Sequence, residues 1–305
     1  MSLGNVVVID DGSGAIKANG KAFSSFVVEG HKDGACSFFR IGFEDFAVVD
    51  THHGALDTTR IEYQTSNSNL VMVHHALMQS GVTGDIKLAV TLPASIFYQK
   101  NGAKNLAEIK KKQTHYLKSI DALDQDFSSV ELPYRISEVI VFPESAPAIY
   151  DAGTAQVDVM GTTIILDIGK FTADVSVFDG GKFVSAASSE DGTHQLFGLI
   201  QRELSNVGSP LSTRSRDDLQ VRYRRGQLSA SIMEPAIANW VSRLVATDEF
   251  SRELAIADLI VVCGGGAYIA GEHIKNLLDS HNVFIPFEPE YAISRGIKVI
   301  LESQA

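Results

Sequence analysis

The sequence predicts an α/β protein with two domains that are built from two copies of one unit. A chain of 305 residues is long enough for two domains, and 45% hydrophobic with 21% charged residues is typical of globular proteins. Residues 5–19 read as a buried strand, a turn with two aspartates and two glycines, and a return strand. Residues 162–178 repeat this order of strand, Asp, glycine turn and strand, which indicates an internal duplication.

Hydrophobic periodicity and turn residues predict the other elements. Apolar residues at helical spacing predict a helix within 69–82, and this helix is expected to stop at Gly81. A further helix, opened by Ser145, is expected after the strand that ends at Pro143. The remaining expected elements are strands within 21–30, 37–49 and 85–97, a basic helix over 105–120, a strand within 136–143, strands within 162–178 and 182–189, a strand running through three glycines into a helix over 257–278, and a helix within 287–303.

Composition narrows the class of protein. The net charge of −11 disfavours direct binding to a nucleic-acid backbone, because such binding needs Lys and Arg to neutralise phosphates. No apolar run approaches the roughly 18 to 20 residues that span a bilayer, and the start shows no signal-peptide pattern. Cys36 and Cys263 lie far apart and outside any metal-binding spacing, which favours a reduced, cytoplasmic setting.

Basic segments and histidine pairs allow more than one interpretation. Residues 109–118 and 214–225 are rich in Lys and Arg, and solvated helix faces or loops are the ordinary interpretation of such runs. A partner surface or a basic wall facing a nucleotide is the alternative. The pairs His52–His53 and His74–His75 are not expected to bind a metal, since neighbours on a helix, as at 74 and 75, point about 100° apart.

The chemistry of the two aspartate turns follows from their residue types. Backbone N–H groups of a tight glycine turn form an anion site, and the missing Cβ lets the chain approach phosphates closely. Asp10 and Asp167 would repel a bare phosphate but suit a hydrated Mg²⁺ that bridges phosphates. Alone, DDGSG is typical of a hairpin turn; together with LDIGKFT and VVCGGGAYI it predicts a metal–nucleotide site. We therefore expect the partner of Asp10 to be a metal–nucleotide and not another side chain, whereas Asp11 has no assigned role.

Five segments in order resemble the signature segments of the actin/Hsp70/sugar-kinase ATPase superfamily. They are VVVIDDGSGAIKANG, VIVFPESAPAIY, TIILDIGKFTADVS, LIVVCGGGAYIAG and PEYAISRGI, and together they extend over nearly the whole chain. Within the superfamily, VMVHHALMQSGV and FPESAPAIYDAG are most similar to the plasmid-segregation actins of the ParM/StbA type. The resemblance implies an actin-like ATPase fold, with two duplicated ribonuclease-H-like domains and a nucleotide cleft between them.

The domain boundaries are expectations that follow from this resemblance. Domain I is expected at 1–158, with 21–69 as a smaller subdomain and the C-terminal helix 289–305 packed back on it. Domain II is expected at 161–288, with a smaller subdomain at about 200–255.

The resemblance also implies the roles of individual residues. Asp10 and Asp167 would share a hydrated Mg²⁺, Glu144 would hold the attacking water, and Lys17 would reach the β-phosphate. The residues expected to contact the nucleotide are Gly12, Ser13, Gly14, Lys17, Gly169, Lys170, Thr172, Gly192, Gly264, Gly265 and Gly266.

Three of these residues keep a second interpretation. Glu144 also fits as a charge placed favourably before a helix N-terminus, and Lys17 also fits as a solvated strand lysine. Lys170 stands where the family usually has a second glycine. Its side chain either shifts the turn or brings an ammonium group near the γ-phosphate.

The implied function is that of a dynamic cytoskeletal ATPase. Such a protein binds Mg²⁺ and ATP, with GTP as an alternative nucleotide, polymerises head to tail, and is destabilised by hydrolysis. It would act in the cytoplasm and move plasmid DNA through a DNA-binding centromere adaptor protein, without contacting nucleic acid or membrane itself.

Other members of the superfamily supply the alternatives. A small-molecule kinase of the sugar type is disfavoured by the short insertions between motifs and by the missing cysteine zinc motif of the compact sugar kinases. A division or shape scaffold usually carries an amphipathic anchor, whereas the tail GIKVILESQA is short and acid-tipped. A chaperone would need a peptide-binding domain beyond the ATPase core.

Overall fold

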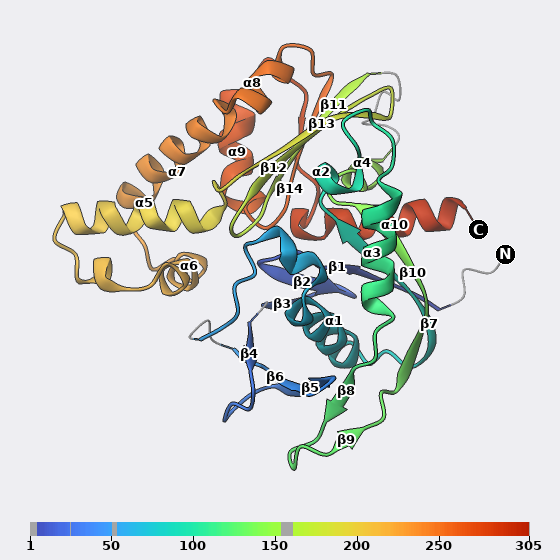
Figure 1. Cartoon of the computed structure of the whole chain (residues 1–305). Helices are drawn as coiled ribbons and strands as arrows, with labels where there is room; N and C mark the ends of the chain where they lie inside the picture. The colour runs from blue at the N-terminus through green and yellow to red at the C-terminus, as the bar shows by residue number, and fades with distance from the viewer. Residues whose placement is uncertain (1–4, 25, 51–53, 154–160, 305) are drawn as a thin grey trace. The chain divides into compact units, whose positions relative to one another are not determined.

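The computed structural model divides the chain into two compact units (Figure 1). Unit 1 consists of Met1–Pro147 together with Ile293–Ala305, and unit 2 is Ala148–Ala292. The pair His52–His53 and most of the expected domain boundary at 158–161 lie outside the described residues. The described residues are 5–24, 26–50, 54–153 and 161–304.

Unit 1 contains two sheets. In the first, of order β10-β7-β1-β2-β3, the apolar strand β1 pairs in parallel with β7 and antiparallel with β2. The second sheet is antiparallel, with the order β4-β6-β5-β8-β9. The strands are β1 Val6–Asp10, β2 Ala15–Ala18, β3 Lys21–Ser24, β4 Val27–Glu29, β5 Ser37–Ile41, β6 Glu44–Val48, β7 Gly84–Leu92, β8 Asp121–Leu123, β9 Ser129–Val130 and β10 Tyr134–Pro143.

Helix α1 (Asn67–Gln79) packs against both sheets of unit 1. It contacts β2 in the first sheet and β4, β5 and β6 in the second, and all its residues from Ser68 to Leu77 are buried. Burial on all sides explains why the helix lacks a narrow apolar stripe. The Ser66 side chain accepts a hydrogen bond from the Asn69 N–H, and Gly81 after the helix has φ +68°, as expected for the predicted C′ glycine.

The C-terminal helix α10 (Ala292–Ser303) packs on the segment that follows β10. Ile293 and Ile297 are buried on one face, and Gly296 lies between them. A Cβ built on Gly296 would lie 1.7 Å from the carbonyl oxygen of Pro147, so the contact is backbone against backbone. The other helices of unit 1 are η1 Ile61–Thr65, α2 Ala94–Phe97 and α3 Leu106–Tyr116.

The helix predicted to open at Ser145 begins three residues later. Helix α4 spans Ala148–Ala152, and Ser145 has φ +69°. A residue that caps a helix N-terminus usually has extended backbone angles, so the left-handed Ser145 cannot act as the N-cap. The segment Glu144–Pro147 is a tight connection, in which Ala146 N–H donates to the Glu144 carbonyl at 2.8 Å.

Unit 2 repeats the pairing pattern of unit 1. In its sheet, of order β13-β12-β11-β14-β15, strand β11 pairs antiparallel with β12 and parallel with β14, as β1 does with β2 and β7. The repeated pattern is the structural counterpart of the repeat in the sequence. The strands are β11 Thr162–Ile168, β12 Ala173–Asp179, β13 Lys182–Ser189, β14 Leu259–Cys263 and β15 Val283–Phe284.

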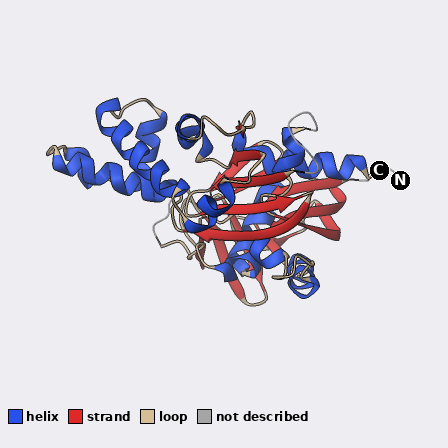
Figure 2. Ribbon diagram, turned by 90° about the horizontal axis from the view of Figure 1, so that it is seen from above, coloured by secondary structure: helices blue, strands red, loops and turns tan. Residues whose placement is uncertain are grey.

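The helices α5, α6 and α7 of unit 2 pack together beside its sheet, and they are the helices at the left of Figures 1 and 2. Trp240 in α7 is fully buried, and its Nε1–H donates to the carbonyl of Asp191 at 2.8 Å. The helices of unit 2 not yet given are α5 Thr193–Asn206, η2 Pro210–Thr213, α6 Arg216–Arg224, α7 Ala230–Val245, α8 Asp248–Leu254, α9 Ala267–Leu277 and η3 Pro289–Tyr291.

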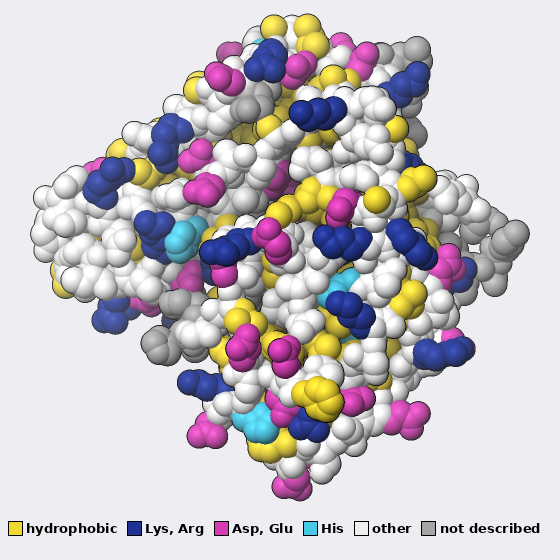
Figure 3. Space-filling view, viewed as in Figure 1, with side chains coloured by type: hydrophobic (Ala, Val, Ile, Leu, Met, Phe, Trp, Pro, Cys, Tyr) yellow, Lys and Arg dark blue, Asp and Glu magenta, His cyan; other side chains and the backbone are white. Residues whose placement is uncertain are grey.

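The surface is mixed in charge. On the face in Figure 3, Lys and Arg side chains are interspersed with Asp and Glu side chains. Among the described residues, no helix combines the length and the apolar character that a membrane span requires.

Three histidines of unit 1, at positions 74, 75 and 115, are buried, and burial lowers the pKa of each. Burial lowers the pKa of His74 to about 3, and the nearby His115 adds to the effect. Burial lowers the pKa of His115 to about 4, with the charges of Lys118 and Lys112 acting in the same direction. His74 Nδ1 is paired with the hydroxyl of Tyr134 at 2.9 Å.

We expect the free energy of unfolding of unit 1 to fall as the pH drops below about 6.5. The unfolded histidines then bind protons that the folded ones exclude, in the case of His74 and His115 down to about pH 4. Each histidine contributes a slope of up to about 1.4 kcal/mol per pH unit. Urea unfolding followed by far-UV circular dichroism from about pH 7.5 to about pH 5 measures this slope. Trp240, the single tryptophan of the chain, reports on unit 2 in the same samples.

The variant His115→Leu removes one of these three groups and should reduce the slope by about a third. His281→Gln, at a partly exposed position in unit 2, serves as the matched control. An unchanged slope in His115→Leu would show that another group causes the acid sensitivity.

Candidate functional site

The aspartate turn of unit 1 is a short hairpin between β1 and β2. Strand β1 ends with the buried Asp10, whose partner in the hairpin register is Lys17. The Lys17 ammonium lies 2.8 Å from Asp10 Oδ2. The expectation that Asp10 has no side-chain partner is therefore wrong, because the hairpin register alone brings a lysine to it. Gly12, Ser13 and Gly14 form the turn and are partly exposed.

Glu144 is brought to the same edge of the sheet as Asp10. Strands β1, β7 and β10 are parallel, so their carboxyl ends lie at one edge. Glu144 follows β10 directly and is half-buried, and its N–H donates to the Leu92 carbonyl at the end of β7 at 2.8 Å. Its Oε1 lies 3.5 Å from the hydroxyl of Thr91. Unit 1 thus brings together the predicted metal ligand, the phosphate turn and the predicted water-binding carboxylate.

The residues behind this turn were not predicted from the sequence. Asp11 is fully buried and pairs with the fully buried Lys112 of α3. Lys112 was expected on a solvated or partner-facing basic helix, and this expectation is wrong for Lys112, although Lys110 and Lys111 are exposed. The spacing of Lys112 and Tyr116 puts both on one face of the helix, but this spacing does not by itself distinguish a buried face from a solvated one.

In unit 2, two glycine-bearing segments pack against the end of β11. Asp167 lies in β11, and Gly264 begins the turn between β14 and α9. Gly264 has φ +81°, and a Cβ built on it would lie 2.3 Å from Asp167 Oδ1 and 2.6 Å from the Ile168 carbonyl oxygen. Gly266 N–H donates to that same carbonyl at 2.8 Å. The turn Gly264–Gly266 is therefore in direct backbone contact with the strand end that carries Asp167.

The second phosphate turn is fixed by the start of α5. Gly192 is the N-cap of α5, and a Cβ on it would lie 2.5 Å from the Lys170 carbonyl oxygen. The Thr193 N–H donates to the Gly169 carbonyl at 3.0 Å, and the next amide donates to the Lys170 carbonyl at 2.8 Å. The turn at 169–172 and the N-terminus of α5 thus form one rigid backbone cluster.

Side chains of this second turn have partners within unit 2. The Lys170 ammonium lies 2.9 Å from Asp217 Oδ1, in the first turn of α6. The hydroxyl of Thr172 donates to Asp174 at 2.8 Å. Burial raises the pKa of Asp174, although hydrogen bonds from Ser188 and Thr172 oppose the shift.

The residues present fit a magnesium nucleotide. Aspartate oxygens are ligands that Mg²⁺ accepts, usually together with several waters and substrate phosphates. Backbone N–H groups at glycine turns are in general suited to phosphate, although the first amides of α5 and that of Gly266 already donate within unit 2. Unit 1 has the carboxylate of Asp10 beside its glycine turn, and unit 2 separately has the carboxylate of Asp167 beside its own glycine turns.

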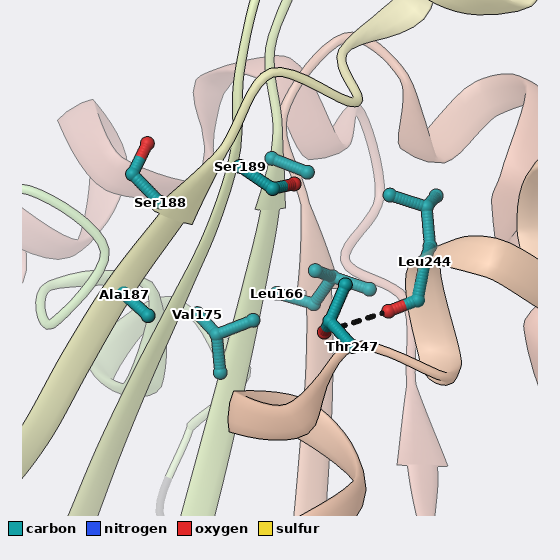
Figure 4. Close-up of a pocket in the computed structure, with 8 residues that line it drawn as sticks. Leu166, Val175, Ala187, Ser188, Ser189, Leu244 and Thr247 are labelled. Atoms are coloured by element: carbon teal, nitrogen blue, oxygen red, sulfur yellow. Dashed lines mark hydrogen bonds between the residues drawn. The ribbon is translucent and has the colours of Figure 1, made fainter.

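A separate depression in unit 2 does not fit this chemistry (Figure 4). It lies between strands β11 to β13 and the segment from α7 to α8, where Thr247 Oγ1 donates to the Leu244 carbonyl at 3.1 Å. Its lining contains only apolar and hydroxyl side chains, so it offers no charge for a phosphate. The lining residues are Leu166, Ala173, Val175, Ala187, Ser188, Ser189, Leu244 and Thr247.

Solved structures with the actin-like fold match nearly the whole chain. The archaeal actin homologue Ta0583 in complex with ADP is 16% identical, with a TM-score of 0.75 over 99% of this chain and 100% of that chain. A ParM in a 15-stranded filament from Clostridium botulinum is 17% identical, with a TM-score of 0.68 over 98% and 99%. Bacillus thuringiensis ParM with ATP is 13% identical, with a TM-score of 0.68 over 99% and 100%. The chain therefore has the actin-like α/β fold.

A sequence model of one family within this fold also matches. The model for the N-terminal part of the plasmid segregation protein ParM (StbA_N) matches residues 5–155. The chain belongs to the ParM/StbA family of plasmid-segregation actin-like proteins. A search of curated protein sequences finds no match.

The close contact at Gly264 predicts a large difference between two neighbouring glycines. Gly264→Ala should lower the free energy of unfolding of unit 2 by at least about 2 kcal/mol, because the new Cβ meets Asp167 and the backbone angle is left-handed. Gly265→Ala, where a built Cβ meets no protein atom within 4 Å, should change it by less than about 0.5 kcal/mol. Urea unfolding followed by Trp240 fluorescence measures both. Equal effects of the two substitutions would contradict the packing described here.

Proposed function

We propose that this chain is an ATPase that binds Mg-ATP, polymerises into dynamic filaments and hydrolyses ATP to destabilise them. By this growth and collapse it would move plasmid DNA in the cytoplasm, with a DNA-binding adaptor protein between filament and DNA. The observation that carries the proposal is the close packing of Gly264 on the β11 end that carries Asp167, together with that of Gly192 on the turn that follows β11. Membership in the ParM/StbA family and the filament and ATP structures of similar proteins support it.

The proposal gives each part of the site a role in binding. Asp10 and Asp167 would hold Mg²⁺ through water, and this ion would neutralise charge on the phosphates. Lys17, already beside Asp10, would balance the charge of the β-phosphate. The glycine turns would donate backbone N–H groups to the phosphates, and the turn Gly264–Gly266 would contact the adenosine.

Glu144 is proposed as the residue that positions water for hydrolysis. Its carboxylate would accept a hydrogen bond from the water whose oxygen attacks the γ-phosphorus. The bond from the γ-phosphorus to the oxygen bridging to the β-phosphate then breaks, which yields ADP and phosphate. The attachment of Glu144 N–H to Leu92 fixes the backbone of this carboxylate relative to the phosphate turn of unit 1.

Light scattering of the purified protein tests the filament proposal. We expect a rise on addition of Mg²⁺ and ATP, followed by a decay as phosphate is released, and no rise with ADP or with EDTA. Binding of a fluorescent ATP analogue, measured in parallel, shows at which concentrations the protein is saturated. Absence of any rise at saturation would contradict polymerisation, and phosphorylation of a sugar by the same preparation would instead support the kinase alternative.

Substitution of Glu144 tests its role in hydrolysis. Glu144→Ala should slow phosphate release at least about tenfold and leave filaments that persist, because the water loses its hydrogen-bond acceptor. Glu138→Ala, at an exposed position on the preceding strand β10, is the control. Filaments of Glu144→Ala that disassemble at the normal rate would exclude this role.

A further inference from the structure

The most unusual group in unit 1 is a lysine with no contact to solvent. Lys112 has 0% of its side chain exposed, and its Nζ donates to Asp11 Oδ2 and Gln64 Oε1, both at 2.5 Å. A buried ammonium is unfavourable unless it is paired and hydrogen-bonded, as it is here. Its neighbours Lys110 and Lys111 are exposed, so the burial is specific to this position.

The two carboxylate oxygens of Asp11 accept hydrogen bonds from different parts of unit 1. Oδ2 accepts from Lys112, from the Tyr116 hydroxyl at 2.7 Å and from Asn69 Nδ2 at 3.3 Å. Oδ1 accepts only from Thr91 among the hydrogen bonds of the described residues, from its N–H and its hydroxyl, both at 3.0 Å. Burial by itself raises the pKa of Asp11, but the charge of Lys112 and these hydrogen bonds outweigh it, and the pKa is lowered.

The hydroxyl of Thr91 lies between two carboxylates. It is 3.0 Å from Asp11 Oδ1 and 3.5 Å from Glu144 Oε1, but it has a single hydrogen to donate. If the hydroxyl turns toward Glu144, Asp11 keeps the Thr91 N–H and all three donors on Oδ2. Lys112 therefore makes it possible for Thr91 to donate to Glu144 without leaving a buried charge uncompensated.

We propose that Lys112 and Thr91 are positioning residues that set the orientation of the Glu144 carboxylate through Asp11. Neither residue contacts the nucleotide in this proposal, which rests on the proposed role of Glu144 in hydrolysis. Without the Thr91 hydroxyl, Glu144 loses this hydrogen bond, and its carboxylate shifts from the orientation in which it positions water. Hydrolysis slows, whereas nucleotide binding, which depends on the turns, is retained.

Single-turnover phosphate release and nucleotide affinity, both measured on the full chain, separate an effect on hydrolysis from an effect on nucleotide binding. Thr91→Val has nearly the same shape but no hydroxyl, and it should slow phosphate release about tenfold with less than about a twofold change in affinity for a fluorescent ATP analogue. Thr91→Ser retains the hydroxyl and should restore the rate. A normal rate in Thr91→Val, or a loss of affinity equal to the loss of rate, would overturn the proposal.

A double-mutant cycle distinguishes action through Glu144 from a general structural effect. The double variant Thr91→Val with Glu144→Gln should release phosphate no more slowly than Glu144→Gln alone. The carboxamide that replaces the Glu144 carboxylate no longer supports hydrolysis, so its orientation does not affect the rate. Independent, multiplied losses would overturn the proposal. If Glu144→Gln itself hydrolyses ATP at the normal rate, the proposed function of Glu144 fails first, and the two failures are thereby distinguishable.

Lys112→Met tests the charge behind Asp11, with the exposed Lys111→Met on the same helix as control. Circular dichroism first establishes that each variant is folded. Folded Lys112→Met should release phosphate more slowly than Lys111→Met at equal nucleotide occupancy. If Lys112→Met does not fold, the Thr91 variants and the cycle decide the matter alone.

Discussion

The buried ion pair of Asp11 and Lys112 is the interaction on which unit 1 depends. It joins the end of β1 to α3, and the hydrogen bonds around it add η1, α1 and the end of β7. Removing one partner of such a pair typically costs about 3 to 5 kcal/mol, because the other charge stays buried without compensation. The pair lies one residue beyond the predicted metal ligand Asp10. The geometry of the phosphate turn is therefore set by the core of the unit as well as by the turn itself.

The two copies of the duplicated unit support their aspartate turns by different means. In unit 1 the residue after the strand-end Asp10 is the charged Asp11, held by a buried polar network. In unit 2 the residue after Asp167 is the fully buried Ile168, against whose backbone the glycines of another turn are packed. The first arrangement depends on charge compensation, and the second depends on the absence of side chains. The same topology thus carries two distinct sensitivities to substitution.

Local patterns in the sequence were sufficient to predict most elements of the fold. Apolar runs that end in Asp and glycine predicted β1 and β11, and helical spacing with a terminal Gly81 predicted α1. The ion pair of Asp10 with Lys17 could also have been predicted, since a tight hairpin fixes its own register. The sequence around Ser145 carries no signal of its left-handed conformation, because the same residues are compatible with several kinds of tight connection.

The burial of Lys112 could not have been read from a single segment. Locally it belongs to a run of three lysines, which is the pattern of a solvated helix face. Its partners Asp11 and Gln64 are 101 and 48 residues away in sequence, and only the packing of three segments makes the position favourable for a charge. The same holds for Thr91, which is an ordinary strand residue until the fold brings two carboxylates to its hydroxyl.

The contact of Gly296 with Pro147 sets the time at which this part of unit 1 can complete its packing during synthesis. Unit 1 is discontinuous, and all of unit 2 is synthesised before the helix that contains Gly296. At ordinary translation rates, about 7 to 30 s pass between the synthesis of Pro147 and that of Gly296. During this time the segment after Glu144 lacks its backbone partner. The segment that follows Glu144 thus reaches its final packing only after unit 2 has been synthesised, when Gly296 packs against Pro147.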